Sequence, residues 1–261
     1  MTNFSNVNQS TLIIARYTFL EAVRNRLFSL VVIGLICLLG LTEFIGELTI
    51  TETRLVQGAL TGSGLRLFVI CIMGLFVVTS TVREFNDKGF EMLLSLAITR
   101  ANYYAGKFIG FALLAFIISI AASALLLLYS PAKDVAYWFI SLSCETLVVI
   151  ALSLLCLFTF SSVTTAFVAV ITFYALSRCM YIVQLISQSP ILETGTLSQG
   201  FINFVLDAIA FVLPDLNLFT RSEWLAYGVD AGQLVPVAIQ TLVYLTLLIA
   251  AGLFDLYRKE F

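Results

Sequence analysis

Two charged residues, Glu145 and Arg178, lie deep inside long apolar segments and are the clearest candidates for polar chemistry in this sequence. A charge surrounded by lipid is costly unless it is paired or faces water. At about 1.5 Å per helical residue, both are predicted to lie roughly 12 to 15 Å below the same membrane surface. We therefore expect the two side chains to meet. They would form either a structural ion pair between neighbouring helices or a polar contact along a substrate path.

Other reactive side chains form no recognisable site. The sequence has no histidine, which excludes histidine-based triads and histidine metal ligands. All five cysteines fall within apolar segments and none belongs to a C-x-x-C pair, so we expect them to pack as small hydrophobic residues. No Walker A motif occurs either. We therefore expect no catalytic site, metal or cofactor in this chain, and nucleotide hydrolysis would belong to another polypeptide.

The elements that must position the charged residues are membrane spans. Of the 261 residues, 60% are hydrophobic and only 11% are charged, and a soluble fold of that composition would aggregate. Several uncharged runs reach the roughly 20 residues that a helix needs to cross a bilayer. We predict an all-α polytopic membrane protein that forms a single domain over residues 1–261. The six predicted spans are Leu27 to Ile45, Leu65 to Val82, Phe108 to Tyr129, Val135 to Phe160, Val163 to Ile186 and Leu234 to Phe254.

The distribution of charge predicts how these spans are oriented. Nine of the 14 basic residues flank the same ends of the spans, whereas the other ends carry four basic residues and most of the acidic ones. By the positive-inside rule, the basic ends and both termini are cytoplasmic. The net charge of −2 and the lack of a basic surface argue against a nucleic-acid partner.

The segment before the first span has a helical pattern of its own. Ile13, Tyr17 and Leu20 recur on one face, while charged residues occupy other faces. This spacing predicts an amphipathic helix over residues 1–26 that lies along the cytoplasmic interface. The alternative is a basic tail that only sets orientation.

The connection over residues 187–233 is predicted to be external and is not simply a polar loop. An apolar helical stripe begins at Phe201 and ends at Pro214, and it is too short to span a membrane. We expect a short interfacial or re-entrant helix there. Near the start of the third span, Gly106 and Gly110 are four residues apart, a spacing that permits close approach of another helix.

The cytoplasmic segment over residues 83–107 mixes charged and apolar residues on a short helical scale. A charged opening ends at Gly89, and an apolar surface follows beside Glu91. Such a segment can dock in a groove on a soluble partner. It can equally float at the lipid headgroups. The pattern by itself does not separate these alternatives.

The same segment resembles the coupling segment of type-2 ABC exporter permeases, in which E-x-x-x-x-G-x-E-x-L-L-S/T-x-P-I/V-S/T-R precedes a G-K at the third span. Ala97 replaces the frequent proline of this pattern, and Phe90 replaces the frequent threonine. The matching residues are Glu84, Lys88-Gly89, Glu91, Leu93-Leu94-Ser95, Ile98-Thr99-Arg100 and Gly106-Lys107. Before the first span, the residues that most resemble the permeases of multicopper-enzyme (nitrous oxide reductase) maturation are Ala15-Arg16, Glu21 and Arg24-Asn25-Arg26.

This resemblance implies a homodimer, or a pseudo-symmetric pair, in the bacterial inner membrane. Two separate cytoplasmic ATP-binding subunits would bind ATP and Mg, and a periplasmic accessory protein is compatible with the family. The residues implied in coupling to the ATPase are Arg83, Glu84, Lys88, Gly89, Glu91, Leu93, Leu94 and Arg100. A second contact would come from the interfacial helix through Arg16, Glu21, Arg24 and Arg26.

The resemblance therefore predicts the permease subunit of an ATP-driven exporter. One rival is a membrane scaffold that recruits an assembly or maturation factor without transporting anything. Another is a secondary transporter, which needs no ATPase-docking segment and often contains inverted repeats that this sequence lacks. The substrate stays open among lipids, polysaccharides, peptides, drugs and a sulfur species for metallocentre assembly.

Overall fold

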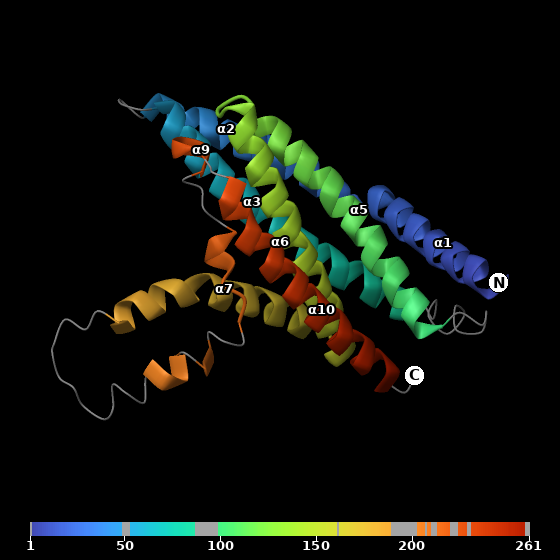
Figure 1. Cartoon of the computed structure of the whole chain (residues 1–261). Helices are drawn as coiled ribbons and strands as arrows, with labels where there is room; N and C mark the ends of the chain where they lie inside the picture. The colour runs from blue at the N-terminus through green and yellow to red at the C-terminus, as the bar shows by residue number, and fades with distance from the viewer. Residues whose placement is uncertain are drawn as a thin grey trace.

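The chain folds into a bundle of long helices, seen in a computed structural model (Figure 1). The structure describes residues 2–48, 53–86, 99–160, 162–188, 203–206, 208–209, 213–219, 224–228 and 231–258. Every regular element in these ranges is helical. The long helices are α1 (Thr2–Arg24), α2 (Arg26–Leu48), α3 (Thr53–Asn86), α5 (Arg100–Leu126), α6 (Ala132–Thr159), α7 (Val163–Gln188) and α10 (Leu234–Arg258). The short elements are η1 (Leu216–Leu218), α9 (Trp224–Tyr227) and η2 (Ala231–Gln233).

Six of these helices, α2, α3, α5, α6, α7 and α10, are long and apolar enough to cross a membrane. Lipid offers no hydrogen-bond partners to the backbone, and a helix pairs its backbone N–H and C=O groups internally. The prediction of an all-α membrane protein is thus confirmed. Exposed apolar side chains cover most of α2 and α10, as lipid-facing helices require.

Helix α6 is the centre of the bundle. It packs against α3, α5, α7 and α10, and it is the most buried of the six spans. Leu142, Ile150 and Leu154 are completely buried and belong to one continuous hydrophobic core. Because α6 touches so many neighbours, a polar group on it can bind groups from several helices.

Helix α1 packs lengthwise on the first part of α5, where two glycines make room for it. A Cβ atom at Gly106 would lie 2.8 Å from Ile14 Cβ, and one at Gly110 would lie 2.8 Å from the Ala15 carbonyl oxygen. The predicted close helix approach at these glycines is confirmed, and its partner is the N-terminal helix. Helix α1 begins at Thr2, before the apolar pattern that starts at Ile13, and it ends at Arg24. Its position relative to a membrane interface stays a prediction.

Helix α3 begins at Thr53, 12 residues before the predicted start at Leu65. Polar groups in this added part are paired with α2: the Gln57 amide donates to the Thr42 carbonyl at 3.2 Å, and the hydroxyls of Thr42 and Thr61 lie 2.7 Å apart. Since these groups are satisfied inside the bundle, the helix continues through a stretch that is less apolar. Arg66 consequently lies well inside a helix and not at its flank.

The two ends of the bundle differ in charge. The end of α3, the start of α5 and the end of α10 meet at one end, which carries Arg83, Arg100, Lys107 and Arg258 and is called the basic end here. Figure 1 places the N-terminus and the C-terminus toward this same end. That arrangement agrees with the predicted topology, in which both termini lie on one side.

At the opposite end, the connection between α7 and α10 folds back over the bundle. Residues 203–206 and 208–209 are helical, as the apolar stripe predicts, Leu213 and Pro214 follow outside a helix, and the other residues of the stripe lie outside the described part of the chain. Trp224 and Leu225 of α9 are buried, and the Ser130 hydroxyl donates to the Leu225 carbonyl at 3.4 Å. At the same end, Tyr129 donates to the Glu43 carboxylate at 2.5 Å.

Candidate functional site

A buried ion pair lies in the middle of the bundle. Arg66 Nη1 on α3 is 2.8 Å from Glu145 Oε2 on α6, and the two side chains are 2% and 0% exposed. Both residues lie 13 positions after the first residue of their helix, roughly 20 Å along its axis. Charges at that depth are tolerated when paired and hydrogen-bonded.

The direct partner of Glu145 is therefore Arg66 and not the predicted Arg178. Arg178 Nη1 donates to the Tyr174 hydroxyl at 3.0 Å, and that hydroxyl donates to Glu145 Oε1 at 2.9 Å. Tyr174 and Arg178 are one turn apart on α7 and share a face, so the tyrosine occupies the space next to the carboxylate. The prediction of a direct Glu145–Arg178 pair was wrong, although both residues belong to one network.

Sequence reasoning missed Arg66 because the predicted second span began at Leu65. Arg66 then counted as an external flank. The absence of charge between Arg54 and Arg66 was the signal that could have placed it inside a longer helix. Lys107, which was also counted as a flank, is 1% exposed. Arg66 and Lys107 thus lie within the spans, as Glu145 and Arg178 do.

The Arg66 guanidinium also binds the connection between α7 and α10. Its Nη1 donates to the Phe219 carbonyl, to which the Ser141 hydroxyl donates at 2.6 Å. Its Nη2 donates to the Trp138 carbonyl at 3.5 Å, and the guanidinium carbon lies 5.3 Å from the centre of the Trp138 ring. The segment that ends at Phe219 therefore enters the bundle as far as the ion pair. Asp215 shapes this segment by accepting from the Asn217 backbone N–H at 3.1 Å.

These contacts give the cluster a clear physical role. It joins α3, α6, α7 and the connection between α7 and α10 through charged hydrogen bonds in a place of low dielectric, where such bonds are strong. Within the described residues it combines two guanidinium groups with one carboxylate. Arg178 is the one charged member that is partly exposed. The cluster is built to fix helix positions, and the alternative of a polar contact along a substrate path stays open.

A second set of contacts anchors both flanks of the predicted coupling segment. At the end of α3, Glu84 forms an ion pair with Lys107 of α5. At the start of α5, the Arg100 guanidinium donates to the carbonyls of Leu256 and Tyr257 at 2.7 and 3.2 Å. Arginine is favourable there because the last carbonyls of a helix lack intrahelical partners. The flanks of the segment are thus tied to α3, α5 and α10.

The remaining predicted coupling residues are placed as follows. Arg83 is exposed on the last turns of α3, and Glu84 is engaged by Lys107. Whether either residue contacts another protein stays a prediction. The coupling residues that lie outside the described part of the chain are Lys88, Gly89, Glu91, Leu93 and Leu94.

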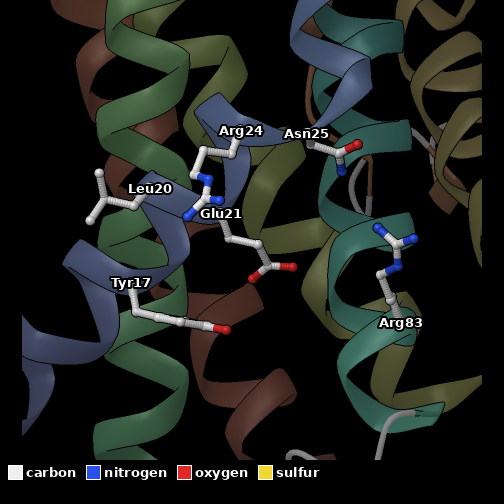
Figure 2. A pocket seen from close by; sticks show the side chains of 6 residues that line it. All are labelled: Tyr17, Leu20, Glu21, Arg24, Asn25 and Arg83. Atoms are coloured by element: carbon white, nitrogen blue, oxygen red, sulfur yellow. The ribbon is translucent and has the colours of Figure 1, made fainter.

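The charged residues of the N-terminal helix lie on two of its faces. Arg16 and Arg24 are exposed, whereas Glu21 is half-buried and accepts from the Ser80 hydroxyl of α3 at 3.3 Å. Arg26 begins α2. Glu21 and Arg24 line an open cavity of about 470 Å³ together with Arg83 (Figure 2).

Within the described residues, no group of three or more histidine, cysteine or acidic side chains could hold a metal ion. Compared with models of known protein families and with curated proteins, the chain has no match.

Proposed function

We propose that this chain is the membrane-spanning subunit of an ATP-driven exporter of the type-2 ABC class. Two copies of it would carry two separate ATP-binding subunits at the basic end, which would face the cytoplasm of a bacterial cell. ATP and Mg would be bound by those subunits. The substrate is not assigned by this proposal.

The observation that carries the proposal is the anchoring of the coupling segment. Its sequence resembles a segment that docks into an ATPase, and its flanks are tied to three helices through Glu84, Lys107 and Arg100. A force applied to the segment would therefore act on α3, α5 and α10 together. A segment that merely floated at the headgroups would need no such anchors.

The buried cluster of Arg66 and Glu145 supports the same proposal, because it lies where a movement that starts at the basic end would arrive. Arg66 and Glu145 connect α3 to α6, and Tyr174 connects α6 to α7. Displacement of α3 at the basic end would therefore be passed to the external connection at Phe219. Packed helices joined in this way move as units rather than deforming continuously.

The decisive experiment changes the docking surface without touching the spans. Glu91→Arg reverses a charge in the coupling segment, and Leu94→Asp places a carboxylate where an apolar anchor would be buried. The native complex is purified from its host and its subunits are identified by mass spectrometry. We expect a Walker A ATPase to copurify with the wild-type chain and to be lost, at least tenfold, from both variants. Glu193→Arg, a charge reversal in the predicted external connection, is the matched control and should retain the ATPase.

A second variant separates the binding of the ATPase from the transmission of its movement to the membrane helices. Arg100→Gln removes the charged hydrogen bonds to the Leu256 and Tyr257 carbonyls, while Glu91 and Leu94 of the docking surface stay unchanged. The ATPase should remain bound, but the change in its hydrolysis rate caused by the membrane subunit should fall. If Glu91→Arg and Leu94→Asp leave both association and hydrolysis unchanged, the coupling role is excluded and a scaffold with contacts elsewhere is favoured.

A further inference from the structure

An open cavity lies at the elbow between α1 and α2, beside the basic end of α3. Its volume is about 470 Å³, and it is called the elbow cavity here. The chain bends at Asn25, whose side-chain oxygen accepts from the Leu27 backbone N–H at 3.3 Å. The lining residues are Tyr17, Leu20, Glu21, Arg24, Asn25 and Arg83 (Figure 2).

The charges of the elbow cavity come from both walls. Arg24 belongs to α1 and Arg83 to α3, and both side chains are exposed. Figure 2 shows the Glu21 carboxylate between the two guanidinium groups. One oxygen of this carboxylate accepts from Ser80, so the group is held in place. The cavity thus offers two exposed cations and one anion held by Ser80, around a volume of about 470 Å³.

The surroundings of the elbow cavity are apolar. Tyr17 and Leu20 are 65% and 47% exposed, and Leu30 and Ile33 of α2, beyond the elbow, are each 53% exposed. In a bilayer, such a surface would contact acyl chains while the charges at the basic end lie at headgroup level. The combination matches an amphiphile, with its polar part in the cavity and its chains along α2.

We propose that the elbow cavity binds a phospholipid whose headgroup carries both a phosphate and a primary amine, as phosphatidylethanolamine does. The phosphate lies against Arg24 and Arg83, because guanidinium groups bind phosphate oxygens through paired, charge-assisted hydrogen bonds. The ammonium group lies against Glu21. A headgroup with a phosphate but no amine would bring a negative charge next to this carboxylate without a cation of its own to offset it. The inference goes beyond the proposed function and does not depend on an ATPase.

The test measures lipid binding to the full chain in detergent. Dioleoyl phosphatidylethanolamine and dioleoyl phosphatidylglycerol are titrated separately, and the bound lipid is quantified by native mass spectrometry. We expect the wild-type chain to prefer phosphatidylethanolamine. Arg24→Gln and Arg83→Gln should each weaken binding of both lipids about tenfold, since each removes a charged hydrogen bond to phosphate. Glu21→Gln should remove the preference between the lipids while leaving phosphatidylglycerol bound.

Arg16→Gln is the matched control, because Arg16 is an exposed arginine of the same helix that does not line the elbow cavity. Its binding of both lipids should equal that of the wild type. Water-soluble glycerophosphoethanolamine should displace the lipid, and inorganic phosphate at the same concentration should displace much less. The proposal is overturned if phosphatidylglycerol binds as tightly as phosphatidylethanolamine, if Arg16→Gln weakens binding as much as Arg83→Gln, or if inorganic phosphate competes equally well.

Discussion

Arg66 and Glu145 are 79 residues apart in sequence, yet their side chains meet at 2.8 Å in the centre of the bundle. This pair fixes α3 against α6. Because neither side chain has access to solvent, the pair has to be intact for either charge to be tolerated. Replacing one partner of a buried ion pair leaves an uncompensated charge and costs more stability than replacing both partners by uncharged residues.

Replacement of Glu145 by Gln is expected to destabilise the protein by about 3 kcal/mol or more, because it leaves the Arg66 guanidinium buried without a counter-charge. Removing both charges in Arg66→Met with Glu145→Gln should cost less than the sum of the two single changes, Arg66→Met and Glu145→Gln. Thermal unfolding of the four proteins in detergent measures this coupling. Equal and additive losses would show that the two residues do not stabilise each other.

The hydrogen bonds that lead from Arg178 through Tyr174 to Glu145 predict how strongly each single variant is destabilised. Tyr174→Phe removes the hydroxyl that donates to Glu145 and accepts from Arg178, at an expected cost of about 1 to 2 kcal/mol. Arg178→Gln leaves the Arg66–Glu145 pair intact and should destabilise less than Glu145→Gln. Urea or thermal unfolding ranks the variants. A loss for Arg178→Gln as large as that for Glu145→Gln would identify Arg178 as the essential counter-ion.

Two glycine-to-alanine changes, one at the contact between α1 and α5 and one on an open face of α2, are expected to have opposite effects. At Gly110, the new Cβ would lie 2.8 Å from the Ala15 carbonyl oxygen, which is backbone and cannot rotate away, so the melting temperature should fall. At Gly40 in α2 no atom lies within 4 Å of the Cβ position. Gly40→Ala should therefore raise stability by about 0.5 to 1 kcal/mol through helix propensity. Stabilisation by Gly110→Ala would mean that α1 does not pack on α5 in the membrane.

The predicted topology is tested by labelling with an impermeant thiol reagent in intact cells. Single cysteines are introduced at Ser5, Asn86 and Ser198 in a cysteine-free chain. Only the cysteine at position 198 should be labelled from outside, and all three should react after the cells are opened. Labelling at position 86 in intact cells would contradict a cytoplasmic basic end.

The sequence determined the fold class and the number of apolar spans by itself. Lipid cannot satisfy backbone hydrogen bonds, so long uncharged runs have to become helices whatever their neighbours are. The spacing of Gly106 and Gly110 also predicted a close helix contact, because glycines four residues apart leave one face of a helix open. These properties depend on the local composition and on the spacing of residues along one helix.

The partners were decided by tertiary structure alone. A single sequence does not state which helices are neighbours, so the glycine face did not identify α1, and the charge of Glu145 did not identify Arg66. The start of α3 at Thr53 depends on contacts of Gln57 and Thr61 with α2, which local hydropathy cannot record. Tyr174 then separates Arg178 from the carboxylate by occupying the space between them. The sequence predicted a buried polar contact at Glu145, and packing chose the residues that form it.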